Sequence, residues 1–257
     1  MQRIICTLSG GKSSAFATQL AIREYGAVNC ILYFNDTGWE HPDLYRFLDD
    51  LSAYFGIPIT NDSDGRNPET LFFDQGMLAN SRVPFCSSVL KAQRLQRFVQ
   101  DGDTLIFGIS HSEAHRAVRI ARVYDELAMR KRIKLNVHFP LMTHNITGDE
   151  IDNWFSEIGI ELPALYRMGF KHNNCGGGCV RSGKAQWLHL LRVDPATYHA
   201  REQTEEAFRE LTGKDVHFIA DTTLKALRER AELQPDLFVE EADETVTECV
   251  GICLTEN

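Results

Sequence analysis

Short runs of apolar residues alternate with amphipathic segments along the first half of the chain. The apolar runs predict buried strands, at residues 3–8, 28–34, 57–59, 104–109 and 137–141. Between them, apolar positions recur at helical spacing and predict helices, at residues 13–25, 42–54, 70–77 and 89–99. Buried strands that alternate with helices are typical of a parallel sheet with helices on both faces. The pattern therefore predicts an α/β fold.

From about residue 146 the strand pattern gives way to helices. Thr147 and Glu150 have the spacing of a capping box at the start of one helix. Further helices are expected at residues 185–192, 195–212 and 224–232. We therefore expect an α/β domain at residues 1–145 and a helical, cysteine-rich C-terminal extension at residues 146–257. The last twenty residues or so are expected to be loosely structured.

Composition and charge narrow the class of protein. The formal net charge is −9, which excludes a basic field over the whole molecule. Hydrophobic residues make up 43% of the chain and charged residues 25%, as in an ordinary soluble protein. No apolar run approaches the roughly 20 residues of a membrane span, and the N-terminus lacks a signal-peptide pattern. A cytoplasmic location without a membrane partner is expected.

The polar segments that follow three of the predicted strands are the first candidates for chemistry. They are residues 9–14, 35–38 and 108–119. In parallel sheets of this class, ligands bind outside the carboxyl ends of the strands. The topology is therefore expected to bring these three segments to one crevice.

The segment Ser9-Gly10-Gly11-Lys12-Ser13-Ser14 stands between a predicted strand and a predicted helix. Its glycines let backbone N–H groups approach an anion closely, and the following helix adds the partial positive charge of its N-terminus. The serines add hydroxyl donors and Lys12 adds a cation. The spacing is neither that of the P-loop nor that of the dinucleotide-binding fingerprint. The segment therefore predicts a phosphate-binding turn of another kind.

Together with later motifs, this turn resembles the PP-loop, SGGxDS, of the adenine nucleotide alpha hydrolase-like superfamily. Ser9, Gly10, Gly11 and Ser14 match, and Ser13 stands where that family usually has Asp. Further segments are similar to the phosphoadenosine phosphosulfate (PAPS) reductase branch: Asp36-Thr37-Gly38, Gly108-Ile109 with Glu113 and Arg116, Pro140-Leu141 with Asp149, and Leu165-Tyr166 with Gly169. Ser110 stands where Arg is usual. The resemblance implies a Rossmann-like sheet that binds ATP and its Mg²⁺.

The resemblance also implies roles for individual residues. The implied nucleotide-binding residues are Ser9, Gly10, Gly11, Lys12, Ser13, Ser14, Asp36, Thr37, Gly38, Gly108 and Arg119. The implied catalytic residues are Lys12, Asp36, Glu113 and Arg116, with Asp36 near the Mg²⁺ and an arginine stabilising charge on the phosphate. Lys91 and Arg94 are weaker candidates, since either also fits a solvated helix face. His111 and His115 are candidates in the third segment, although a lone histidine is more often structural or on the surface.

The seven cysteines form an odd count, which argues against a disulfide framework. Cys6 and Cys30 lie in predicted strands and are expected in the core. The remaining five are candidate metal ligands: Cys86, Cys175, Cys179, Cys249 and Cys253. Their spacing fits a metal clamped by Cys-x3-Cys pairs, either as zinc or as an iron–sulfur cluster, and also fits free thiols. The resemblance favours a [4Fe–4S] cluster, because cysteines at positions 86, 175 and 179 are usual in iron–sulfur relatives.

The pattern Cys-Gly-Gly-Gly-Cys from Cys175, followed by Gln186-Trp187, is similar to PAPS-reductase-like proteins of DNA phosphorothioation systems and of phages. This implies an ATP pyrophosphatase that converts ATP to AMP and pyrophosphate and so activates an oxygen for replacement by sulfur. A PAPS or APS reductase, a tRNA thiolation enzyme and a non-catalytic nucleotide-binding subunit remain alternatives. The implied partners are a cysteine desulfurase, other sulfur-modification subunits, and nucleic acid bound through a complex.

Overall fold

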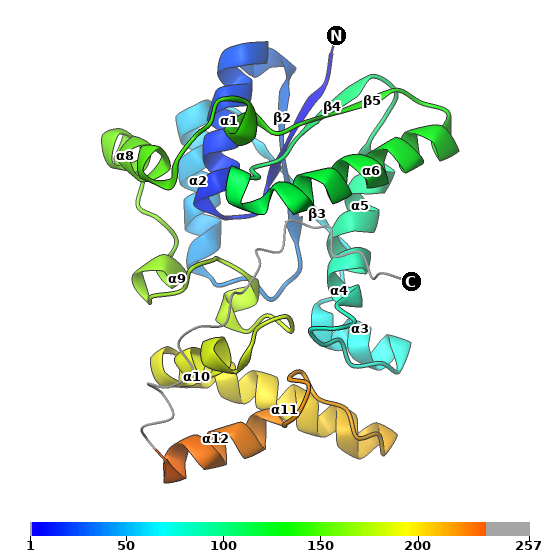
Figure 1. Ribbon diagram of the computed structural model, residues 1–257, viewed down its shortest axis with the longest axis vertical. Helices are drawn as coiled ribbons and strands as arrows, with labels where there is room; N and C mark the ends of the chain where they lie inside the picture. The colour runs from blue at the N-terminus through cyan, green and yellow to red at the C-terminus, as the bar shows by residue number, and fades with distance from the viewer. Residues whose placement is uncertain (1, 235–257) are drawn as a thin grey trace. The chain divides into compact units, whose positions relative to one another are not determined.

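Five strands form one sheet in the computed structural model, which describes residues 2–234. They are β1 (Ile4–Leu8), β2 (Cys30–Asp36), β3 (Ile59–Ser63), β4 (Asp103–Ile106) and β5 (Leu135–His138), in the order β3-β2-β1-β4-β5 (Figure 1). β1 pairs in parallel with β2 and with β4, and β4 pairs in parallel with β5. The strand order reverses between β1 and β4, and this reversal is where open parallel sheets bind their ligands.

Helices cover both faces of this sheet, as the alternating pattern predicts. On one face Ile4, Cys6 and Leu8 of β1 pack with residues of α1 (Lys12–Tyr25), α2 (Asp43–Phe55) and α8 (Gly148–Ile158). On the other face, the rings of Tyr33 and Phe98 lie 4.6 Å apart, and those of Phe107 and Tyr124 lie 5.7 Å apart. These contacts involve α5 (Gln93–Phe98) and α6 (Ala114–Lys131). The α/β, Rossmann-like fold is therefore confirmed.

Helix α6 is the main element that the sequence pattern did not predict. It buries Ala117, Ile120, Tyr124 and Leu127, which recur at helical spacing. The apolar stripe lies among arginines at positions 116, 119, 122 and 130, which make the segment polar on average. A smaller correction concerns residues 137–141, because β5 ends at His138 and Pro140 begins the short helix α7 (Pro140–Thr143). Proline suits the first helical position since its missing N–H needs no partner there.

A second set of helices has its own core. Helices α10 (Lys184–Val193), α11 (Pro195–Thr212) and α12 (Leu224–Leu233) pack around buried aromatic residues such as Trp187, Tyr198 and Phe208. The same core includes residues of α3 (Pro68–Gln75), α9 (Ala164–Arg167) and the turn that contains Trp39. The predicted helices of the extension are therefore present, and α8 begins with the predicted capping box.

The described residues belong to two compact units that interleave along the sequence. The first unit comprises residues 2–36, 42–62 and 93–164 and contains the sheet. The second takes residues 37–41, 63–92 and the described residues from 165 onward. Compact units need not coincide with domains, so the boundary at residues 145/146 stays a prediction. None of the described helices has the length and apolarity that crossing a bilayer demands.

Candidate functional site

The loop after β1 is held in shape by its own serines. The Ser9 N–H and hydroxyl donate to Ser14 Oγ over 3.1 and 3.2 Å, and Ser14 Oγ donates to the Gly11 carbonyl over 2.8 Å. Gly10 has a φ of 78°, a conformation that glycine adopts without strain. Helix α1 then begins without a side-chain cap and without an acidic residue in its first turn. The loop therefore combines a fixed backbone with first-turn N–H groups that no side chain caps, as an anion site requires.

Gly108, which follows β4, lies directly against this loop. A Cβ atom at residue 108 would stand 2.6 Å from the backbone N and Cα of Ser14 and 2.7 Å from the Ser13 carbonyl carbon. Real Cβ atoms essentially never approach backbone that closely, so only glycine fits here. The structure thus brings the predicted residues of the β1 loop and Gly108 together at the reversal of strand order.

The two charged candidates at the start of α6 form an ion pair with each other. Arg116 donates to Glu113, and both side chains are largely buried. Arg119 follows one turn later on the same helix. His111 is bound instead to the end of α7, with Nε2 3.0 Å from the Met142 carbonyl and 2.8 Å from Asn145 Oδ1. Glu113 and Arg116 therefore belong to one charged group.

Lys12 and Asp36 have partners inside the first unit. Lys12 Nζ lies 2.6 and 2.9 Å from the carboxylate oxygens of Asp152 on α8. This ion pair is exposed, and exposed pairs contribute only about 0–1 kcal/mol, so a phosphate could take the lysine from Asp152 at small cost. Asp36 accepts hydrogen bonds from the Tyr45 hydroxyl over 3.0 and 3.1 Å. Sequence reasoning identified neither Asp152 nor Tyr45.

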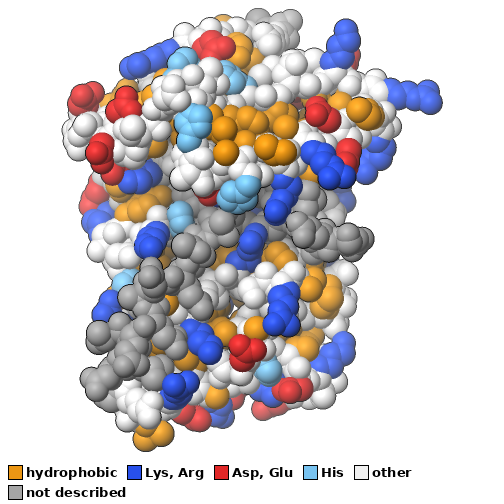
Figure 2. Space-filling view, viewed as in Figure 1, with side chains coloured by type: hydrophobic (Ala, Val, Ile, Leu, Met, Phe, Trp, Pro, Cys, Tyr) orange, Lys and Arg blue, Asp and Glu red, His pale blue; other side chains and the backbone are white. Residues whose placement is uncertain are grey.

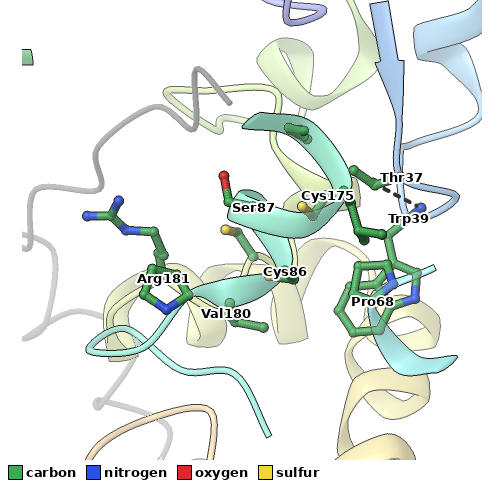
Figure 3. A pocket seen from close by; sticks show the side chains of 12 residues that line it. Thr37, Trp39, Pro68, Cys86, Ser87, Cys175, Val180 and Arg181 are labelled. Atoms are coloured by element: carbon green, nitrogen blue, oxygen red, sulfur yellow. Dashed lines mark hydrogen bonds between the residues drawn. The ribbon is translucent and has the colours of Figure 1, made fainter. Parts of the chain in front are cut away.

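The predicted cysteines of the second unit line one pocket with about 380 Å³ of empty space, its open mouth included. Cys86 belongs to the short helix α4 (Phe85–Ser87), and Cys175 and Cys179 belong to the loop that contains the 3-10 turn of residues 175–177 (Figure 3). Trp39 and Lys91 line the pocket as well. The two glycines between residues 175 and 178 have φ angles of 63° and 86°, which lets the loop turn tightly between its cysteines.

The carboxylate of Glu40 contacts three walls of this pocket. Its Oε1 accepts from the Thr37 hydroxyl over 3.0 Å and from Lys91 Nζ over 3.3 Å, and its Oε2 accepts from the backbone N–H of Cys175 over 3.3 Å. The side chains of Glu40 and Lys91 are only 2% and 9% exposed. A solvated helix face is therefore the wrong interpretation of Lys91. Arg94 belongs to the other unit, where it binds Asp62.

The electrostatic surroundings of the cysteine loop are those of a buried site. The hydrogen bond with Cys179 and burial both raise the pKa of the Cys175 thiol. Arg201 lies with its guanidinium carbon 3.5 Å from the ring centre of Trp39, and burial lowers the pKa of that arginine. An anionic occupant of the pocket would be stabilised by the cations of Lys91 and Arg201.

Two buried donors in residues near Cys175 and Cys179 in the sequence lack a partner among residues 2–234. They are Asn174 Nδ2 and Ser182 Oγ, in residues that are 5% and 2% exposed. An unsatisfied buried donor costs about 1–3 kcal/mol, so such atoms commonly indicate a bound group. Three thiols line the pocket, and thiolates are the usual ligands of zinc and of iron–sulfur clusters.

In the described part of the chain, no three side chains of His, Cys, Asp and Glu gather closely enough to hold one metal ion. Cys249 and Cys253, the other predicted ligands, lie outside the described residues. The five-cysteine metal centre stays a prediction.

The predicted nucleotide-binding residues fall into both units. Ser9–Ser14, Asp36, Gly108 and Arg119 belong to the first unit, whereas Thr37 and Gly38 belong to the second. Thr37 is buried and bound to Glu40, and Gly38 has a φ of 69°. Nothing in the sequence marks Glu40 beyond its place after the Asp-Thr-Gly segment, because its partners Lys91 and Cys175 lie 51 and 135 positions away along the chain.

The sequence model of the phosphoadenosine phosphosulfate reductase domain family matches residues 3–180, more than half of the 257-residue chain. No curated protein matches the chain. The matched range contains the β1 loop, Asp36–Gly38, the start of α6, and Cys86, Cys175 and Cys179.

Proposed function

Because the chain belongs to the phosphoadenosine phosphosulfate reductase domain family, we propose that it is an ATP pyrophosphatase that activates a nucleic acid for sulfur incorporation. The substrate that we propose is DNA, which would receive sulfur as a phosphorothioate. Membership of the family assigns nucleotide-utilising chemistry related to sulfur. The choice of ATP and DNA is the further step, and it is supported by the site and by the sequence motifs.

The observation that carries the proposal is the loop after β1. Its serines fix a backbone whose first-turn N–H groups have no side-chain cap, at the place where the strand order reverses. The loop matches the PP-loop motif SGGxDS in its Ser-Gly-Gly, residues 9–11, and in its final serine, Ser14. This match supports pyrophosphate as the anion. We therefore place the β- and γ-phosphates of ATP on Ser9–Ser14, with the Mg²⁺ of the nucleotide near Asp36.

The proposed reaction needs a leaving group better than a phosphate oxygen. An oxygen of the substrate phosphate attacks the α-phosphorus of ATP, the bond from that phosphorus to the bridging oxygen breaks, and pyrophosphate leaves with the electron pair. A sulfur nucleophile then attacks the adenylylated phosphorus, and AMP leaves with the substrate oxygen. Lys12 would exchange Asp152 for the leaving pyrophosphate, and Arg116 would stabilise charge on the α-phosphate, with Glu113 holding it in place.

The cysteine pocket supports the sulfur chemistry. Cys86, Cys175 and Cys179, with one of the two C-terminal cysteines, would hold a [4Fe–4S] cluster. When bound, such a cluster supplies an electron-transfer or sulfur-binding centre.

A partner is expected to bring most of the contacts to the nucleic-acid backbone. The chain is acidic overall, and the face drawn in Figure 2 presents Asp and Glu as well as Lys and Arg side chains. Protein–DNA affinity depends mainly on neutralising phosphates with cations, so such a surface favours binding through a complex. A cysteine desulfurase is the expected source of the sulfur.

Reduction of a sulfonucleotide is the second candidate function, and the family match favours it as directly as the first. The polar surroundings of Ser110 support the ATP proposal instead. Its hydroxyl lies 2.8 Å from that of Ser112, at the position where the reductase motif has an arginine to bind sulfate. A serine supplies no positive charge for that anion.

One experiment separates the two functions. The full chain is prepared without oxygen. One sample is incubated with Mg²⁺ and ATP labelled in the α-phosphate, with and without DNA. A second sample is incubated with a sulfonucleotide and reduced thioredoxin. We expect AMP and pyrophosphate from ATP, with at least a tenfold loss in R116Q and none in the control R122Q. Arg122 is exposed on the same helix and bound only to Glu126 among the described residues. Release of sulfite, without cleavage of ATP, would establish the reductase.

Tight ATP binding without cleavage would contradict the pyrophosphatase and identify the non-catalytic subunit. Cleavage that is stimulated by tRNA and not by DNA would replace DNA phosphorothioation with tRNA thiolation. The first outcome is read by adding a measurement of ATP binding, and the second by adding tRNA as a further arm of the assay.

A further inference from the structure

Glu40 is the acceptor at which three distant segments of the second unit meet. Its partners are Thr37 in its own turn, Lys91 in the π-helical turn of residues 88–92, and Cys175 in the cysteine loop. All three segments line the pocket that contains the thiols. π-Helical turns are rare and occur frequently at functional sites, so the presence of Lys91 in one agrees with a specific role.

The three contacts require a carboxylate. Every partner is a donor: a hydroxyl, an ammonium and a backbone N–H. An ionised carboxylate has two acceptor oxygens and no donor, whereas a glutamine amide has one acceptor oxygen and an NH₂ group. A glutamine that keeps Thr37 and Lys91 would turn its NH₂ toward the N–H of Cys175, and that contact would be lost.

We propose that Glu40 is a positioning residue that fixes the cysteine loop of residues 174–181 against the other pocket walls and so sets the spacing of the thiols. The charge of Lys91 compensates the buried carboxylate, which explains why both side chains are nearly inaccessible. The inference adds a residue to the proposed cysteine centre, but the contacts on which it rests are independent of what the pocket holds.

The test compares E40Q with a matched control, E202Q. Glu202 is also a buried carboxylate of the second unit, and its main partner is Arg228 on α12. Hydrogen–deuterium exchange of the full chain, purified without oxygen, is followed by mass spectrometry on the peptide that covers Cys175. We expect E40Q to exchange at that peptide at least roughly tenfold faster than the native chain, as expected when a charge-assisted hydrogen bond is removed. E202Q should leave this peptide unchanged.

A second readout is the iron and sulfide content of each variant, with its visible absorption. If Glu40 positions the thiols, E40Q binds less iron than the native chain and E202Q binds as much. The proposal would be overturned if the Cys175 peptide exchanged at the same rate in E40Q and in the native chain. Equal acceleration over all peptides of the second unit would also overturn it, since this indicates a loss of general stability. Faster local exchange in a protein whose native form binds no iron would support the role of Glu40 and contradict the proposed cluster.

Discussion

At the scale of single residues, Gly108 gives the sharpest prediction. Replacing it with alanine puts a methyl group within 2.6 Å of the Ser14 backbone, and main chain cannot yield as a flexible side chain does. We expect G108A to shift the β1 loop, to cost about 1–3 kcal/mol of stability as overpacking does, and to weaken ATP binding at least roughly tenfold. Thermal unfolding and calorimetric titration with ATP measure the two effects.

Gly148 provides the control for that substitution. Nothing lies within 4 Å of a Cβ built at Gly148, so G148A should bind ATP like the native chain. Native affinity in G108A would show that the loop does not hold the nucleotide.

The residues of the site differ in how far the sequence predicts them. Ser9–Ser14 and Gly108 are recognisable because their chemistry is local: glycines and hydroxyls that follow a buried strand. Glu40 and Asp152 are not recognisable, because each acts on partners from elsewhere in the chain. The contact from Glu40 to Cys175 spans 135 positions, and that from Lys12 to Asp152 spans 140. No periodicity or motif encodes such a pairing.

At the scale of elements, the pattern of apolar positions predicted the strands and most helices. Its main failure is α6, a helix rich in charged residues. Helix α6 has its apolar stripe among arginines and was missed. The predicted helix at residues 89–99 is present, but residues 88–92 form a π-helical turn and α5 follows from Gln93. A π-helical turn of five residues is too short for hydrophobic periodicity to distinguish it from an α-helical turn.

The pairing of α11 with α12 predicts a dependence of stability on pH. Arg228 donates to both carboxylate oxygens of Glu202 over 2.8 and 2.9 Å, and this lowers the pKa of Glu202 below its ordinary value of 4.5. The stabilisation is therefore complete above pH 4.5 and is lost as the pH falls through the lower pKa of the folded chain. We expect E202Q to melt several degrees below the native chain at neutral pH, with a difference that shrinks below pH 4.5.

His199 lies 3.4 Å from the same carboxylate, so both chains are compared in an H199Q background, where that histidine cannot titrate. Thermal unfolding followed by circular dichroism between pH 3 and 7 gives the two curves. A difference that stays constant over this range would show that the ion pair with Arg228 contributes nothing through the charge of Glu202.

At the scale of the whole molecule, the sequence predicts consecutive parts, whereas the contacts define interleaved units. Residues 37–41 and 63–92 lie within the α/β part of the sequence and belong to the unit of the C-terminal helices. Interleaving follows from long-range packing, such as that of Trp39, Phe72 and Trp187 in one core, which a linear reading of composition cannot show. Each unit has its own hydrophobic core, so each has the means to respond separately to a ligand.

The three tryptophans can report on the units separately. Trp154 packs 5.2 Å from the ring of Phe16 in the first unit, whereas Trp39 and Trp187 lie in the core of the second. In W39F/W187F the fluorescence follows the first unit, and in W154F it follows the second.

A ligand at 100 times its Kd stabilises the state that binds it by about 2.7 kcal/mol. We expect Mg²⁺ with an ATP analogue that resists cleavage between the α- and β-phosphates to raise the melting temperature reported by Trp154 by several degrees, and that reported by Trp39 and Trp187 by less. Each shift is measured within one variant, so any loss of stability from the phenylalanines cancels. Equal shifts in both variants would mean that the units unfold together, and a larger shift in W154F would place the phosphates away from the β1 loop.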